Sequence, residues 1–92
     1  MSTVFAGDVG TEIVLDCGVD TTAATVRSVI ARKPNGAKVT WSAMQEGTNS
    51  IKHVTVSGDL DMAGAWKLQA YIEILGWKGY GGVAVLTVEN PL

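Results

Sequence analysis

Apolar and polar residues alternate with a period of two in several short segments of this chain, and glycine or proline lies between most of them. This pattern is typical of β-strands joined by tight turns. The predicted strands cover residues 12–17, 25–32, 37–44, 50–57, 64–75 and 83–88. No segment favours a helix longer than the single turn that we expect at 60–63. The sequence therefore predicts an all-β sandwich or small barrel of six to seven antiparallel strands.

The strand at 64–75 has the clearest alternation, and we expect one of its faces to be buried. The residues on that face are Trp66, Leu68, Ala70 and Ile72. In the strand at 50–57, Val54 and Val56 alternate with His53 and Thr55. We expect His53 to be exposed or to lie on an edge strand, and Cys17 to be a small buried residue on a strand.

The segment Lys33-Pro34-Asn35-Gly36 predicts a hairpin between the strands at 25–32 and 37–44. Proline presets the φ angle that a turn needs, and glycine accepts a positive φ after asparagine. The strand at 25–32 has apolar residues on both faces, and Ile74 and Leu75 are adjacent. One of those two must point away from the core, so we expect apolar groups at the surface that serve in contacts between copies.

Length and charge narrow the classes of function. The 92 residues fit one domain covering residues 1–92. Apolar residues make up 47 % and charged residues 17 % of the chain, which excludes a disordered tail. The net charge is −2 and the pI is about 5.1, which argues against a nucleic-acid partner. No apolar run approaches the roughly 20 residues that span a bilayer, and Met1–Phe5 does not begin a signal peptide.

The residues offer no convincing catalytic or metal site. His53 is the only histidine and Cys17 the only cysteine, and no motif surrounds either of them. Asp59 and Asp61 invite a calcium interpretation, but carboxylates that cap a short turn explain them better. We therefore expect a protein that is not an enzyme and that uses no metal or cofactor.

The aromatic residues near the C-terminus are more informative. Trp77 and Tyr80 lie in the glycine-rich segment 76–82, which we expect to be a loop between the last two strands. With Lys78 they form a candidate interaction loop, because large aromatic side chains are enriched at contact surfaces. Three roles remain open for Trp77: it caps the end of the sandwich, it contacts a partner, or it stacks on a sugar.

The segment 61–70 reads Asp-x-Ala-Gly-x-Trp-x-Leu-x-Ala, and it resembles the corner that leads into strand F of immunoglobulin-like domains. Trp66 stands where those domains usually have tyrosine, and their cysteine pair is absent. The resemblance implies an immunoglobulin-like β-sandwich.

The whole chain also resembles small bacteriophage and prophage structural proteins, whose sandwich is similar to the N-terminal domain of phage baseplate upper proteins. The matching segments are 7–13, 32–36, Val39-x-Trp41 and 58–71. The baseplate proteins normally carry a further receptor-holding or oligomerising region, and the sequence ends at Leu92 without one, which favours a stand-alone virion component. The resemblance implies a multi-copy head, neck, tail or baseplate protein that is assembled in the host cytoplasm and contacts itself or other virion proteins. The alternative is a carbohydrate- or receptor-binding adhesive module that uses Trp77 and Tyr80.

Overall fold

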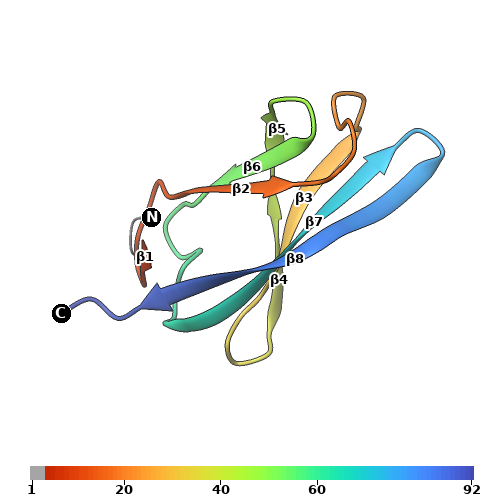
Figure 1. Cartoon of the computed structure of the whole chain (residues 1–92). Helices are drawn as coiled ribbons and strands as arrows, with labels where there is room; N and C mark the ends of the chain where they lie inside the picture. The colour runs from red at the N-terminus through yellow and green to blue at the C-terminus, as the bar shows by residue number, and fades with distance from the viewer. Residues whose placement is uncertain (1–3) are drawn as a thin grey trace.

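The computed structural model describes residues 4–92, and all regular structure in that range is β-strand (Figure 1). The eight strands are β1 (Val4–Phe5), β2 (Glu12–Asp16), β3 (Val26–Arg32), β4 (Lys38–Ser42), β5 (Met44–Glu46), β6 (Ser50–Val54), β7 (Gly64–Ile74) and β8 (Trp77–Glu89). The prediction of an all-β fold is confirmed. The single helical turn expected at 60–63 is wrong, because that segment bends without forming a helix. None of the described residues forms a helix long and apolar enough to cross a membrane.

Two sheets make up the fold. The larger has five strands in the order β1-β8-β7-β3-β4, and the smaller has three in the order β2-β6-β5. The chain passes from the large sheet to the small one at Ala43, the single residue between β4 and β5. All pairs are antiparallel except β1 and β8, which run parallel, so the expectation of a purely antiparallel arrangement is wrong at this edge.

The core lies between the two sheets and collects the inner faces of their strands. The buried apolar residues are Ile13, Leu15, Val29, Ala31, Trp41, Ile51, Leu60, Trp66, Leu68, Ala70, Ile72 and Val88. Trp66 is fully buried, and its ring lies 5.9 Å from that of Trp41. The predicted inner face of the strand at 64–75 is confirmed at all four positions.

The turn between β3 and β4 has the predicted conformation. The Gly36 N–H donates to the Lys33 carbonyl at 2.9 Å, and Gly36 has a φ of +92°. This is the three-residue hairpin loop in which a glycine follows a tight turn. The start of β7 packs on the same loop, because a Cβ on Gly64 would lie 2.6 Å from Cγ of Pro34.

The small sheet contradicts one expectation. β6 is the central strand of that sheet, and Ile51, His53 and Thr55 face the core, while Val54 and Val56 are exposed. The expectation that His53 is exposed or at an edge is therefore wrong. The segment has apolar residues of both parities, so its alternation alone does not decide which face is buried.

Candidate functional site

The segment predicted as an interaction loop is a strand. β8 begins at Trp77 and pairs with β7 from Ile74 back toward Gly64, so only Leu75 and Gly76 remain as the turn. The expectation of a mobile loop over 76–82 is therefore wrong. Trp77, Lys78 and Tyr80 lie instead on the upper part of a long β7–β8 hairpin. The hairpin tip lies at the same end of the molecule as the β2–β3 connection and the β5–β6 turn (Figure 1).

Trp77 lies on the inner face of the hairpin, beyond the part that the small sheet covers. Its cross-strand neighbour is Ile74, and its ring lies directly over Gly79, where a Cβ would collide with the ring carbons. With Val19 and Ile74 it lines a small apolar hollow of about 200 Å³. Trp77 is 48 % exposed and Leu75 is 95 % exposed. We call Val19, Ile74, Leu75 and Trp77 the tip patch.

Tyr80 lies on the opposite face of the hairpin from Trp77. It pairs with Tyr71 on the outer side of the large sheet, and the two rings are 5.1 Å apart. The Tyr71 hydroxyl donates to the Glu73 carboxylate at 2.8 Å, and this hydrogen bond raises the pKa of the Tyr71 phenol. Trp77 and Tyr80 therefore cannot form one flat aromatic platform.

A β-bulge divides the hairpin into an upper and a lower part. Gln69 pairs with Val83 and Tyr71 pairs with Tyr80, so Gly81 and Gly82 together oppose Ala70. Such a bulge bends its strand and increases its twist. The two glycines thus set the direction in which the tip leaves the two-layered part of the molecule.

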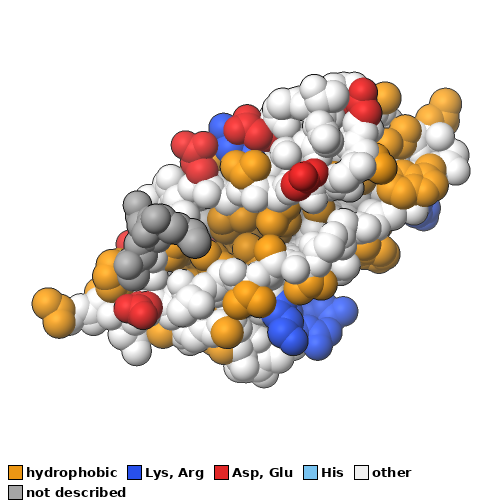
Figure 2. All heavy atoms as spheres, in the orientation of Figure 1, with side chains coloured by type: hydrophobic (Ala, Val, Ile, Leu, Met, Phe, Trp, Pro, Cys, Tyr) orange, Lys and Arg blue, Asp and Glu red, His pale blue; other side chains and the backbone are white. Residues whose placement is uncertain are grey.

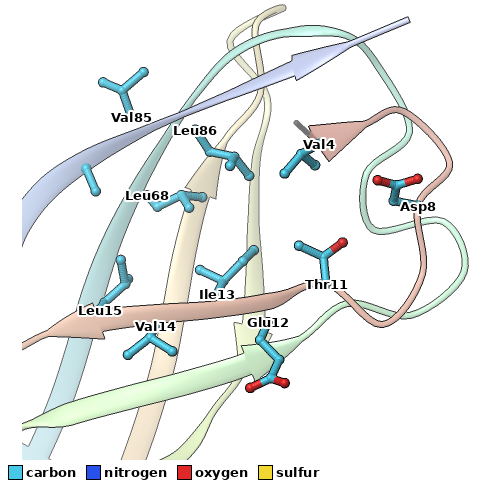
Figure 3. Close-up of a pocket in the computed structure, with 11 residues that line it drawn as sticks. Val4, Asp8, Thr11, Glu12, Ile13, Val14, Leu15, Leu68, Val85 and Leu86 are labelled. Carbon is cyan, nitrogen blue, oxygen red and sulfur yellow. The ribbon is translucent and has the colours of Figure 1, made fainter. Parts of the chain in front are cut away.

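A groove opens between β2 of the small sheet and β8 of the large sheet (Figures 2 and 3). Its volume is about 580 Å³, and its walls include Ile13, Leu15, Leu68 and Leu86. Glu12 borders it, but its side chain points away from the groove, and its carboxylate lies 3.4 Å from Nζ of Lys52. The groove is an apolar opening into the core, and the described residues that line it include no histidine, cysteine, lysine or arginine.

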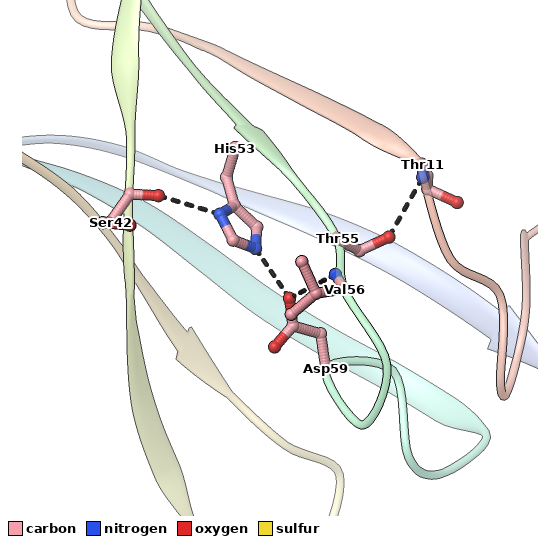
Figure 4. A network of polar contacts seen from close by, with 6 residues as sticks. All are labelled: Thr11, Ser42, His53, Thr55, Val56 and Asp59. Atoms are coloured by element: carbon pink, nitrogen blue, oxygen red, sulfur yellow. Dashed lines mark hydrogen bonds and ion pairs between the residues drawn. The ribbon is translucent and has the colours of Figure 1, made fainter.

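His53 belongs to a buried polar network (Figure 4). Its Nδ1 donates to the Ser42 carbonyl at 2.8 Å, and its Nε2 lies 2.8 Å from Oδ2 of Asp59. The same oxygen of Asp59 accepts the Val56 N–H at 2.9 Å, which confirms the predicted turn cap. The ring also stacks on Trp41 at 4.8 Å. The network ties β4, β6 and the following turn together, and the two hydrogen-bond partners of the His53 ring are a backbone carbonyl and a carboxylate, not a hydroxyl or a thiol.

Cys17 and His53 are not brought together. His53 pairs with Ile13, and Cys17 follows four residues further along, about 13 Å at the rise of a strand. Cys17 lies just after the end of β2 and is only partly buried, so the expectation of a buried strand residue is wrong. Its partial burial is the larger cause, and the nearby Asp16 carboxylate the smaller, of a raised pKa of the thiol. The Asp61 carboxylate accepts from Nζ of Lys33 at 2.7 Å instead of capping the turn, so the expected cap is confirmed for Asp59 alone. Among residues 4–92, no cluster of three or more acidic, histidine or cysteine side chains could hold a metal ion.

Sequence reasoning missed the burial of His53 and the extension of β8 to the hairpin tip. Only weak signals were available. Ile51 shares the parity of His53, and Gly79 and Gly81 alternate with Lys78 and Tyr80. Glycines carry no side chain, so they leave no hydrophobic pattern by which a strand is recognised.

No family model, no curated protein and no solved structure matches this chain.

Proposed function

We propose that this protein is a non-enzymatic structural module that works through protein–protein contacts in a multi-copy assembly, of the kind found in bacteriophage virions. The observation that carries the proposal is the amount of apolar surface exposed on regular strands and at the hairpin tip. The exposed apolar residues include Val14, Met44, Leu75, Trp77, Val83 and Val85, at exposures between 48 % and 95 %. They fall into three groups, on the outer side of the small sheet, on the outer side of the large sheet and at the hairpin tip. Contiguous exposed apolar groups are typical of interfaces.

The proposed fold is an immunoglobulin-like sandwich, and two features support it. The first is the strand order, in which consecutive strands are distributed over two facing sheets and the last strand pairs with its predecessor. The second is the corner before β7, where Trp66 Nε1 donates to the Met62 carbonyl at 3.1 Å. In immunoglobulin-like domains a tyrosine hydroxyl makes the equivalent bond to the backbone a few residues upstream.

Sedimentation velocity over a range of protein concentrations tests the proposed function. We expect the chain to form larger species as concentration rises, and Trp77→Ala to reduce this association. Val56→Ala is the matched control, because Val56 is 58 % exposed but lies in the turn after β6. If the protein remains a monomer at all concentrations and binds no other protein of such an assembly, the proposal is wrong.

A second candidate function is an adhesive module for a carbohydrate or receptor. The observation that favours it is the hollow beside Trp77, where a half-exposed indole and Val19 form an apolar wall. Aromatic rings of this kind stack on sugars and bury apolar ligand surface. Binding to a glycan array that Trp77→Ala abolishes would favour this function. Binding that instead depends on Tyr80 would place the ligand on the opposite face.

A further inference from the structure

The outer face of the large sheet carries a row of three cations. Val29 and Ala31 are buried, so alternation along β3 puts Arg32 on the outer side. Arg32 pairs with Lys38 of β4 on one side and with Lys67 of β7 on the other. All three are exposed, and none of them forms an ion pair with another of residues 4–92. Like charges at directly opposite strand positions are destabilising, so an anionic partner would relieve the repulsion within this row.

The cation row borders a shallow hollow with apolar parts. The hollow has a volume of about 170 Å³, and its lining includes all three cations together with Ile30, Gln69 and Val83. Ile30 and Val83 each pair with Gln69, so they belong to the next row of the sheet. The surface therefore presents a line of positive charge beside a line of partly apolar residues. We call this surface the basic face.

The outer face of the small sheet has the complementary arrangement. Asp16 and Glu46 both pair with Ser50, so they stand in one row at the two edges of the sheet. The next row holds Val14 and Met44 on either side of Lys52. Nζ of Lys52 lies 3.4 Å from the Glu12 carboxylate and 4.0 Å from that of Glu46, so the face has three carboxylates and one cation. Val14 is 48 % and Met44 54 % exposed. We call this surface the acidic face.

The spacing of the two faces also matches. Lys38 and Lys67 are separated by two strand spacings, about 10 Å, and the same separation applies to Asp16 and Glu46. On each face, the row two residues further along the strands contains apolar side chains. These are Ile30 and Val83 on the basic face and Val14 and Met44 on the acidic face. In Figure 2 acidic side chains gather over the upper region, where β2 and β6 lie, with a basic side chain among them, and basic side chains lie together below β8.

We propose that the basic face of one copy docks on the acidic face of the next copy. The two lysines of the cation row then meet Asp16 and Glu46, and the neighbouring row with Ile30 and Gln69 lies against the row of Val14, Lys52 and Met44. The inference rests on the proposed function and names its partner as a second copy of this chain. A nucleic acid or another polyanion is a weaker candidate, because the chain's net charge of −2 repels it and the acidic face would remain unused.

The two faces lie on opposite sides of the molecule, so the contact is head-to-tail. A contact of this kind does not close in a dimer; it produces rings or open stacks. Electrostatic pairing of this type also fixes the register of the partners and weakens as salt screens the charges. We therefore expect larger species at low ionic strength and dissociation as salt is added.

A charge-swap experiment tests the interface on the full chain by sedimentation velocity. The variant Lys38→Glu/Lys67→Glu and the variant Asp16→Lys/Glu46→Lys should each lose self-association by about tenfold or more, because both faces of each variant then carry the same sign. An equal mixture of the two should associate again, because the reversed faces are complementary to each other. Glu89→Lys is the control for charge reversal away from the acidic face, and it should associate as the wild type does.

The outcomes separate this interface from the proposed function. Asp16 caps the Gly18 N–H at 2.8 Å, so Glu46→Lys alone provides a second variant if the double variant does not fold. Self-association that neither reversal changes, or a mixture that does not recover, would overturn the interface and leave the proposed function standing. A wild-type chain that binds heparin but never associates would overturn the interface and assign the cation row to a polyanion. Association by neither the wild type nor the mixture would count against both.

Discussion

Trp66 and Trp77 lie on the same inner face of the same hairpin, one near each end, yet Trp66 is fully buried and Trp77 is half-exposed. The small sheet covers only the lower part of the hairpin. Gly81 marks the limit, because a Cβ there would lie 3.6 Å from the Asp16 carbonyl and 3.8 Å from Cα of Cys17. Beyond that point no strand of the small sheet opposes the hairpin; Ile72 is still buried, but at Trp77 only the β2–β3 connection, through Val19, lies beside it. Alternation along the strand thus decides which face a residue takes, and the length of the opposite sheet decides whether that face is covered.

The largest expected effect tests the covered end. Trp66→Ala should reduce the free energy of unfolding by about 3–5 kcal/mol, because it leaves a large cavity between the sheets. It also removes the hydrogen bond from Nε1 to the Met62 carbonyl. Urea denaturation followed by circular dichroism measures the change. A variant as stable as the wild type would mean that Trp66 is not in the core.

The next effect concerns the glycine that begins the covered strand. Gly64 has a φ of +131° and packs against Pro34, so Gly64→Ala should destabilise the fold by about 1–3 kcal/mol. Gly82→Ala, in the bulge of β8, is the control, because a Cβ at Gly82 meets nothing within 4 Å. Thermal melting of the two variants should separate them clearly. Equal melting temperatures would show that the contact with Pro34 is unimportant.

Trp77→Ala tests the other end of the hairpin, where the small sheet does not cover the tryptophan. Because Trp77 is packed on one side only, its loss should change the free energy of unfolding by less than about 1 kcal/mol. Association should weaken by about 2 kcal/mol, as it does for aromatic residues at the centre of interfaces. Denaturation and sedimentation together measure both quantities. A large loss of stability with unchanged association would make Trp77 a cap of the core.

The smallest effect is at Cys17, which lies at the boundary between the two parts. Partial burial and the Asp16 carboxylate raise the pKa of its thiol. Because the thiolate is the reactive form, alkylation by iodoacetamide at pH 8 should be slower than that of a free cysteine. The midpoint of the rate against pH should lie correspondingly higher. Unfolding in urea should remove the difference, and a difference that persists in the unfolded chain would not come from the fold.

The sequence predicted the covered part of the molecule better than the uncovered part. In β7, large apolar residues alternate with polar ones over many positions, so one face was unambiguous. In β6, Ile51 and Val54 have opposite parity, and the buried face depends on pairing with β2 and β5, which are distant in sequence. The cation row was missed for the same reason, although the hairpin at Pro34 alone places Arg32 opposite Lys38.

The bulge at Gly81 and Gly82 affects the direction of the hairpin tip but not which side chains the tip exposes. Deleting Gly82 would leave Gly81 opposite Ala70 and would keep Tyr80 opposite Tyr71 and Val83 opposite Gln69. Every side chain would therefore stay on its present face, while the bend would be lost. The presence or absence of one residue in this bulge thus sets the direction of the tip. Removing or restoring that residue would re-aim the tip without changing the side chains of either the tip or the core.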